Sequence, residues 1–316
     1  MQAYLVRRLL LALATLAGLS FVIFLFLRFI PGDATTLLLG ADVSSSPAQL
    51  HELRHRLGLD QSAPVQYFTW LGHVLRGELG RSLFSNRSVT SEIGARLPTT
   101  AELALIALLV AALFGIPAGT LSALRHNRTT DQVLRAVCTI GLAVPNFWLG
   151  TMVLVFGARW FNWVPPISYT SPFRDPLRNL EEFIIPGLVV GLAFAATLTR
   201  LTRSAVLEVM REDYVRTARA KGLMPHTVVV RHVIRNSLIP VLTLLGIQLG
   251  LIVAGTVIVE NVFNLPGMGR LILDGITRKD FPLVQGIILL YGTFVVLINL
   301  LVDWTYGIID PRIHYV

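Results

Sequence analysis

Long apolar runs separated by short polar segments dominate the chain. A bilayer core of about 30 Å is crossed by about 20 apolar residues in helical form. Six runs reach this length: Leu9–Ile30, Ala101–Leu124, Leu134–Phe161, Phe183–Leu201, Leu238–Val262 and Leu283–Ile309. Arg28, Arg159 and Asp303 lie near the ends of these runs, where a charged group can reach the membrane interface. The pattern predicts an all-α integral membrane protein with about six transmembrane helices.

The composition supports this interpretation. Hydrophobic residues make up 53% of the 316 residues, charged residues only 15%, and the mean hydropathy is +0.65, which excludes an ordinary soluble domain. The basic residues that give a pI near 10.2 are dispersed over the loops, so no nucleic-acid partner is expected. The single cysteine, Cys138, lies in an apolar run and excludes an intrachain disulfide.

The distribution of Lys and Arg predicts the orientation in the membrane. With the N-terminus inside, the short inner segments hold fourteen Lys and Arg residues and the short outer loops hold five. Both termini are therefore expected to be cytoplasmic. Arg7 and Arg8 precede the first run as in a signal peptide, but an apolar length of about 22 exceeds a typical signal core and favours an uncleaved anchor.

These spans and loops divide the chain into three parts. Residues 1–31 are expected to form the first transmembrane helix, residues 32–97 an extracytoplasmic cap, and residues 98–316 a five-helix core with a cytoplasmic loop at about 202–237. In the cap, Ser46 before Pro47 with Gln49 predicts a helix start, and Gly58 can end that helix. The aromatic stretch Val65–Leu75 predicts a second short helix near the membrane interface.

The first cap helix contains a pattern that resembles a metal site. The residues His51-Glu52-Leu53-Arg54-His55 match H-E-x-x-H, which places two histidines on one helical face beside a general-base glutamate. A zinc hydrolase also needs a third ligand and a sheltered cleft, and short motifs match frequently by accident. Two exposed histidines on an amphipathic helix are the favoured interpretation, with a zinc hydrolase as the alternative, and no metal ligand is assigned.

The apolar runs also contain residues with possible roles in packing or transport. Glycine pairs at small-xxx-small spacing permit close helix approach: Gly115/Gly119, Gly187/Gly191 and Gly246/Gly250. Prolines that can break or kink a helix occur at three positions: Pro117, Pro145 and Pro240. Gln248 and Asn299 are polar at membrane depth, which fits a solute pathway or interhelical hydrogen bonding about equally.

The sequence indicates that any energy source lies outside this chain. The middle portions of the six runs contain no Asp, Glu, Lys or His, which argues against a proton-coupled carrier. Lys221 and Lys279 are not followed by Ser or Thr, so neither completes a P-loop. If transport is driven by ATP, another subunit must hydrolyse it. A channel that needs no ATP is the alternative.

The segment Glu208–Pro240 is a polar island between two apolar runs, with a net charge of +3. Leu207, Met210, Tyr214 and Ala218 recur at helical spacing and predict an apolar stripe, while Glu212 and Arg216 predict an ion pair on the polar side. Gly222 is expected to end this helix, and a second helical stretch follows at 227–236. The prediction is a helix-glycine-helix elbow, with an amphipathic hairpin resting on anionic lipid as the alternative.

The stretch Asp213–Gly222, DYVRTARAKG, resembles the cytoplasmic coupling-loop motif of permease subunits of bacterial ABC importers, in the form of the peptide and nickel branch. In that family the motif inserts a short helix into a cleft of the ATPase. The chain carries Arg216-Thr217-Ala218 where the broad importer pattern has Glu-Ala-Ala, a difference that fits the peptide branch. Other similar segments span nearly the whole chain: Arg7–Asp33, Gly77–Ser82, Arg231-His232, Asn236, Pro240, Glu260–Gly269 and Asp310–Arg312.

The resemblance implies a type I ABC importer permease in a bacterial inner membrane, with no catalytic residue and no cofactor of its own. Its implied partners are a homologous second permease, two ATPases that bind ATP and Mg²⁺, an extracytoplasmic solute-binding protein and membrane lipid. The implied substrates are di- and oligopeptides, with nickel or glutathione-like molecules as the alternative, and no substrate-binding residue is assigned. The implied ATPase-coupling residues are Asp213, Tyr214, Arg216, Thr217, Ala218, Arg219, Ala220, Lys221 and Gly222.

Overall fold

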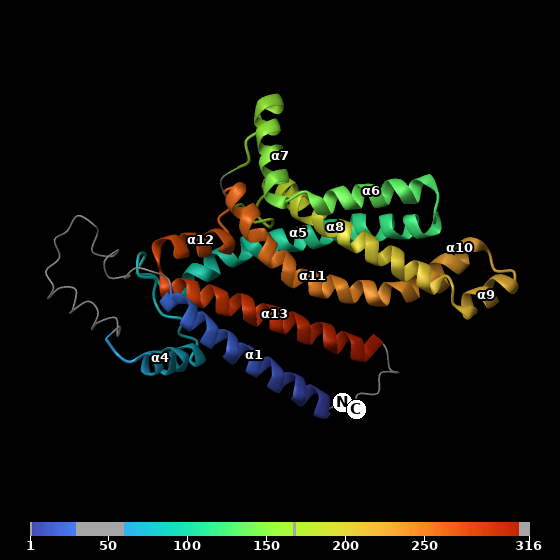
Figure 1. Cartoon of the computed structure of the whole chain (residues 1–316). Coiled ribbons are helices and arrows are strands. Elements are labelled where there is room, and N and C mark those ends of the chain that lie inside the picture. The colour runs from blue at the N-terminus through green and yellow to red at the C-terminus, as the bar shows by residue number, and fades with distance from the viewer. Residues whose placement is uncertain (1, 30–59, 167–168, 310–316) are drawn as a thin grey trace. The chain divides into compact units, whose positions relative to one another are not determined.

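The computed structural model describes residues 2–29, 60–166 and 169–309, and these residues are almost entirely helical (Figure 1). In the described part of the chain, the one β-bridge joins Arg81 and Ser88. The all-α prediction is therefore confirmed. The His51–His55 motif and the predicted first cap helix lie outside the described residues. The chain divides into two compact units, one built from residues 1–98, 270–297 and 315–316 and the other from residues 99–269 and 298–314.

The first unit contains α1 (Gln2–Phe29), α4 (Ala63–Leu75), most of α12 (Met268–Arg278) and the start of α13 (Phe281–Ile309). Helix α4 confirms the second short helix expected after the first span, and it packs on α1. Phe24 of α1 contacts the rings of Tyr67 and Trp70, with centroids 5.3 and 6.3 Å apart. The Tyr67 hydroxyl lies 3.0 Å from Ser20 Oγ, so the aromatic face of α4 is fixed to the first span.

A buried carboxylate holds the loop after α4 in the same unit. Asp280 is 2% exposed, and its carboxylate accepts hydrogen bonds from Ser82 Oγ at 2.5 Å and from the Leu83 N–H at 3.2 Å. The Ser82 hydroxyl in turn accepts from the backbone N–H groups of Phe84 and Ser85. The loop therefore has a defined conformation next to the start of α13.

The second unit is arranged around α8 (Pro176–Val209), which runs beside α5 (Val89–Leu124), α6 (Thr129–Ala143) and α11 (Arg235–Val262) (Figure 1). Glycines let α5 and α8 approach closely. A Cβ on Gly119 would lie 2.6 Å from the Thr199 carbonyl oxygen, and one on Gly191 would lie 2.7 Å from the Ala107 carbonyl oxygen. These two glycines are therefore packing positions, as the small-residue spacing predicted.

The third expected span is broken in two. Helix α6 ends at Ala143, and α7 (Asn146–Phe161) continues at an angle of 93°. Pro145 is the cause, because proline lacks a backbone N–H and forces the preceding residue out of the helical region; Val144 accordingly has φ −85° and ψ 120°. In the described part of the chain five helices are long and apolar enough to cross a membrane, or six if the bent pair is one span.

Candidate functional site: the elbow between α8 and α11

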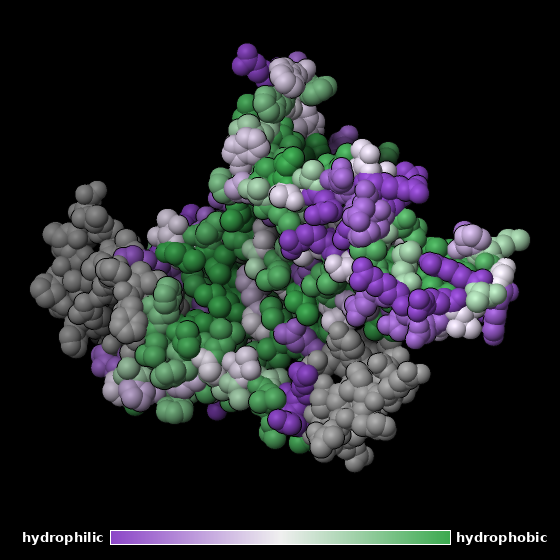
Figure 2. Space-filling model, turned by 45° about the vertical axis from the view of Figure 1, so that its right-hand side comes forward, coloured by the Kyte–Doolittle hydropathy of each residue, from purple (hydrophilic) through white to green (hydrophobic). Residues whose placement is uncertain are grey.

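The polar island forms an elbow, defined here as residues 210–236. It contains the turn 210–212, α9 (Asp213–Ala220), the glycine turn at 221–224, the short α10 (Pro225–Thr227) and the π-helical segment η1 (Val228–Ile234) that leads into α11. At this end of the second unit also lies the α5–α6 turn (Figure 1). Hydrophilic residues gather over this end, whereas the helix walls are mostly hydrophobic (Figure 2).

The elbow does not continue α8 as one helix, which corrects the predicted apolar stripe at Tyr214. The other three members, Leu207, Met210 and Ala218, do pack in one apolar cluster. Helix α8 ends at Val209, and Glu212 adopts an extended conformation with φ −66° and ψ 144° before α9 begins. The break resets the helical phase. The residues of α9 that are buried are therefore Val215 and Ala218, while Tyr214 is 42% exposed.

An apolar cluster fixes α9 to the membrane helices. Its buried members come from α5, α8, α9 and η1: Ala123, Val206, Val215, Ala218, Val228 and Val233. Burying one valine side chain contributes roughly 1.5–3 kcal/mol relative to leaving it in water. Helix α9 is thus attached to the ends of α5 and α8 and to the segment entering α11.

Gly222 ends α9 as the sequence predicted. The Gly222 N–H donates to the Arg219 carbonyl at 3.0 Å, and the Leu223 N–H donates to the Ala218 carbonyl at 3.4 Å, which is the Schellman arrangement. Gly222 has φ +76°, a left-handed conformation that costs other residues strain. An added Cβ would meet no atom within 4 Å, so the constraint at this position is the backbone angle and not the packing.

The outward side of α9 is basic and exposed. Arg216, Arg219 and Lys221 are all exposed. Arg216 Nη1 lies 3.4 Å from Asp213 Oδ1, and these side chains are 77% and 95% exposed. This pairing replaces the predicted Glu212–Arg216 pair, because Glu212 is the N-cap residue and lies outside the helix. Exposed pairs of this kind contribute about 1 kcal/mol or less, so the charges remain available to a partner.

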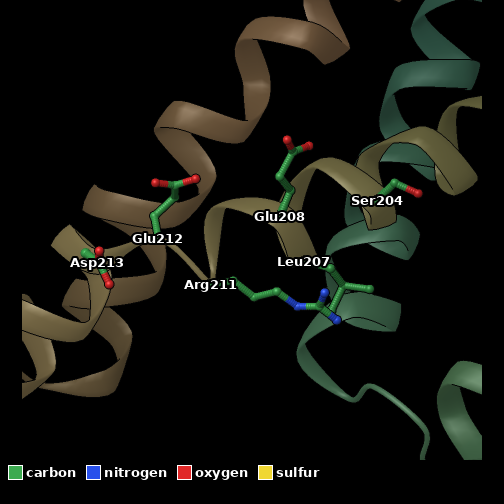
Figure 3. A pocket seen from close by; sticks show the side chains of 6 residues that line it. All are labelled: Ser204, Leu207, Glu208, Arg211, Glu212 and Asp213. Atoms are coloured by element: carbon green, nitrogen blue, oxygen red, sulfur yellow. The ribbon is translucent and has the colours of Figure 1, made fainter.

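An open groove of about 480 Å³ lies between the end of α8 and the start of α9 (Figure 3). Six residues line the groove: Ser204, Leu207, Glu208, Arg211, Glu212 and Asp213. They supply three carboxylates and one guanidinium. Of the six, only Asp213 was among the predicted coupling residues. The others escaped prediction because the groove exists only where the helix breaks, and Met210-Arg211-Glu212 contains no proline or glycine that would signal a break.

A buried ion pair anchors α8 just before the elbow. Asp131 of α6 is fully buried and accepts from Arg203 Nε and Nη2, both at 2.8 Å. The same carboxylate accepts from Ser122 Oγ at 2.6 Å and from the Asn127 N–H at 2.9 Å. The bidentate geometry joins α8 to the α5–α6 turn. The pairing joins residues 72 positions apart and was not foreseen.

The other end of α11 carries the segment Glu260–Gly269, which is held together by hydrogen bonds to a buried carboxylate. The Glu260 carboxylate is fully buried and accepts from Thr100 Oγ1 and from the Gly269 N–H, each at 2.7 Å. The Met268 N–H donates to Thr100 Oγ1 at 2.8 Å. A Cβ on Gly267 would overlap the Glu260 carboxylate. The segment therefore serves packing, with the Glu260 carboxylate bonded to groups of the protein itself.

The fold and the elbow define a multi-pass helical membrane protein that carries a structured polar elbow between two of its spans. The chain belongs to the family of inner membrane components of binding-protein-dependent transport systems, whose main model matches residues 115–315 and whose N-terminal model matches residues 1–104. It is a permease subunit of an ABC importer, as the sequence resemblance indicated.

Two curated relatives illustrate the similarity over the full length. The di/tripeptide transport system permease protein DppB of Pseudomonas aeruginosa (strain UCBPP-PA14) is 38% identical over 338 residues, with 100% of this chain and 99% of that protein covered. The glutathione transport system permease protein GsiC of Salmonella choleraesuis (strain SC-B67) is 37% identical over 315 residues, with 100% of both chains covered.

Solved structures support the fold. An inward-facing structure of a methionine ABC transporter matches with a TM-score of 0.57 and 16% identity, covering 70% of this chain and 97% of the other. A crystal structure of an amino acid ABC transporter with histidines matches with a TM-score of 0.56 and 14% identity, covering 70% of this chain and 95% of the other. The type I importer permease architecture is thereby confirmed for the matched part.

Proposed function

We propose that this chain imports di- and oligopeptides as one of two homologous permeases in an ATP-driven complex of the bacterial inner membrane. Two cytoplasmic ATPases bind ATP and Mg²⁺, and an extracytoplasmic solute-binding protein delivers the substrate. In this arrangement both termini and the elbow are cytoplasmic, residues 202–237 are the coupling loop, and residues 32–97 form the outward-facing cap. The chain itself performs no covalent chemistry.

One observation carries the coupling role: α9 is buried on one side and charged on the other. Its inner side joins the apolar cluster through Val215 and Ala218, and its outer side presents Arg216, Arg219 and Lys221. A helix that merely rested on lipid would place its apolar face outward, toward the acyl chains. Here the apolar face is already used inside the protein, so the charged face is the one that meets a partner.

The mechanism follows from these attachments. Closure of the ATPase pair pushes on the exposed side of α9, and the apolar cluster passes the displacement to Val206 of α8 and Ala123 of α5. The Asp131–Arg203 ion pair makes α6 follow α8. The close glycine contacts between α5 and α8 let these helices rock together rather than separately. The substrate pathway then opens alternately to the two sides.

Gly222 supplies the sharpest test. In the variant Gly222→Glu, we expect the complex to assemble while import is lost, because the side chain strains the left-handed turn and projects into the docking surface. Gly222→Asn is the matched control, since asparagine tolerates the left-handed region and carries a shorter, neutral side chain. ATPase co-purification and uptake into proteoliposomes are the measurements. Normal uptake by the Glu variant would reject the role of this turn.

The substrate class is tested with defined probes. The similarity to the di/tripeptide permease DppB supports short peptides as the first candidate substrates. The similarity to the glutathione permease GsiC supports glutathione as the second candidate. Proteoliposomes with the complete complex are supplied with radiolabelled dialanine, trialanine or glutathione. We expect ATP-dependent import of at least one of the two peptides. Import of glutathione alone would replace the peptide assignment with the second candidate and leave the coupling role unchanged.

A further inference from the structure

The helix that enters α11 contains a π-helical segment at the point where α9 touches it. Residues 225–262 form one continuous helical stretch, and Val228–Ile234 within it are π-helical. The carbonyl oxygen of His232 accepts two side-chain donors, Asn236 Nδ2 at 2.8 Å and the Tyr214 hydroxyl at 3.4 Å. Asn236 Nδ2 also lies 3.0 Å from the Tyr214 hydroxyl. The three groups form a closed triad between α9 and this helix.

The triad has a direct bearing on helical register. In an α-helix the His232 carbonyl would accept from the backbone N–H of Asn236, four residues later. The Asn236 side chain donates to that same carbonyl at 2.8 Å, and asparagine side chains can compete with backbone donors in this way. A π turn bonds one residue further along, is rare, and is found frequently at functional sites. Asn236 and Tyr214 are thus placed to favour the π register.

Helix α9 holds the π segment from two sides. Val215 packs with Val228 and Val233 in the apolar cluster, and the neighbouring Tyr214 reaches the His232 carbonyl on the polar side. A displacement of α9 therefore acts on the same turn through both contacts. Because a π turn contains one more residue than an α turn, a change of register would rotate the part of the helix beyond it.

We propose that Tyr214 and Asn236 are positioning residues that hold η1 in the π register, and that a change between π and α register in η1 converts movement of α9 into rotation of α11. This inference rests on the proposed coupling function of the elbow. It adds a specific element that has two discrete states, and it assigns a role to Asn236, which lies in the loop 202–237 but outside the stretch Asp213–Gly222.

The first experiment removes the triad without disturbing the apolar cluster. In Tyr214→Phe and Asn236→Ala, we expect the complete complex with its second permease, ATPases and binding protein to assemble normally. Import of radiolabelled dialanine and glutathione per ATP hydrolysed should fall about two- to tenfold, the range for loss of one hydrogen bond from one of two states. Tyr67→Phe is the matched control, since its hydroxyl bonds Ser20 within the first unit, and it should leave this ratio unchanged.

The two substitutions should not add. Because both residues act on one carbonyl, the double variant should couple no worse than the worse single variant. Deleting Val230, which is 48% exposed within η1, removes the additional residue of the π turn and should uncouple hydrolysis from import in the same way. An unchanged ratio of import to hydrolysis in both single variants and in the deletion would overturn the inference.

Hydrogen exchange separates this inference from the proposed function. In the assembled complex without nucleotide, Tyr214→Phe should change amide exchange at residues 228–236, whereas Tyr67→Phe should not. This measurement needs no transported probe, so it tests the register even if neither probe is carried. Absence of an ATPase from the wild-type complex would reject the proposed function. An ATPase-bound complex with identical exchange in wild type and Tyr214→Phe would reject only the triad.

Discussion

Two polar segments flank α11, and each depends on glycine for a different physical reason. At the elbow, Gly222 adopts φ +76° with open space around its missing side chain. In the segment Glu260–Gly269, Gly267 and Gly269 press against the buried Glu260 carboxylate. The elbow needs a left-handed turn, whereas the other segment needs close packing. The comparison teaches that a glycine in a motif can serve a turn or close packing, and that only its backbone angle and its neighbours show which.

The largest expected effect on stability comes from the Asp131–Arg203 ion pair, which lies just before the elbow. It sharpens the comparison by testing whether this pair anchors α8 there. Asp131→Asn removes one partner of a buried, bidentate ion pair and leaves Arg203 without its charge partner. We expect a loss of about 3–5 kcal/mol of unfolding free energy, measured by thermal unfolding of the purified chain in detergent. The double variant Asp131→Asn/Arg203→Gln should recover part of it. A single variant as stable as the wild type would contradict the anchoring role of the pair.

A smaller effect separates the two kinds of glycine. In Gly269→Ala the added Cβ would overlap the Val257 backbone and lie 2.8 Å from Glu260 Oε2, which should cost about 1–3 kcal/mol. Gly222→Ala meets no atom and should cost about 1–2 kcal/mol from the left-handed angle alone. Asparagine distinguishes the causes: it should relieve the strain at 222 and increase the overlap at 269. Equal responses to asparagine at both positions, read from thermal unfolding, would break the comparison.

The smallest effect on stability concerns the exposed pair on α9. Asp213→Asn leaves Arg216 without its neighbour, and both side chains are largely exposed, so we expect a change below about 0.5 kcal/mol in unfolding free energy. The affinity of the complex for its ATPases should change more than this and should depend on salt, because the docking face is charged. Binding measured at two salt concentrations checks this. A salt-independent affinity would argue against docking through these charges.

The sequence was informative where a local signal sufficed. Long apolar runs predicted the spans, the aromatic stretch 65–75 predicted α4, and Gly222 predicted the end of α9. Pro145 was recognised as a possible break, but the continuous apolar run across it suggested one span. Hydropathy does not report the angle between two helices, which is 93° here. The break at 210–212 has no glycine or proline to mark it. The π segment is contacted by Tyr214, which lies 18 residues from His232 in the sequence.

Contacts between distant residues were beyond prediction from one sequence. The Asp131–Arg203 pair joins two helices, and Ser82 bonds Asp280 across 198 residues. Nothing near any of these residues in the chain indicates its partner. The carboxylates are buried only because the fold supplies donors for them, so their role becomes visible only when the helices are packed. The coupling segment was assigned by resemblance, and it remains a prediction that experiments must test.

Site-directed photocrosslinking tests the central claim most directly. A photoreactive residue in place of Arg216, which is 77% exposed, is compared with one in place of Leu177, which is 78% exposed at the start of α8. The 34-residue α8 separates these ends by about 50 Å, at about 1.5 Å per residue. In the assembled complex in lipid nanodiscs, position 216 should form a covalent adduct with an ATPase subunit, and position 177 should form none. Adducts of position 216 with lipid alone would contradict the account.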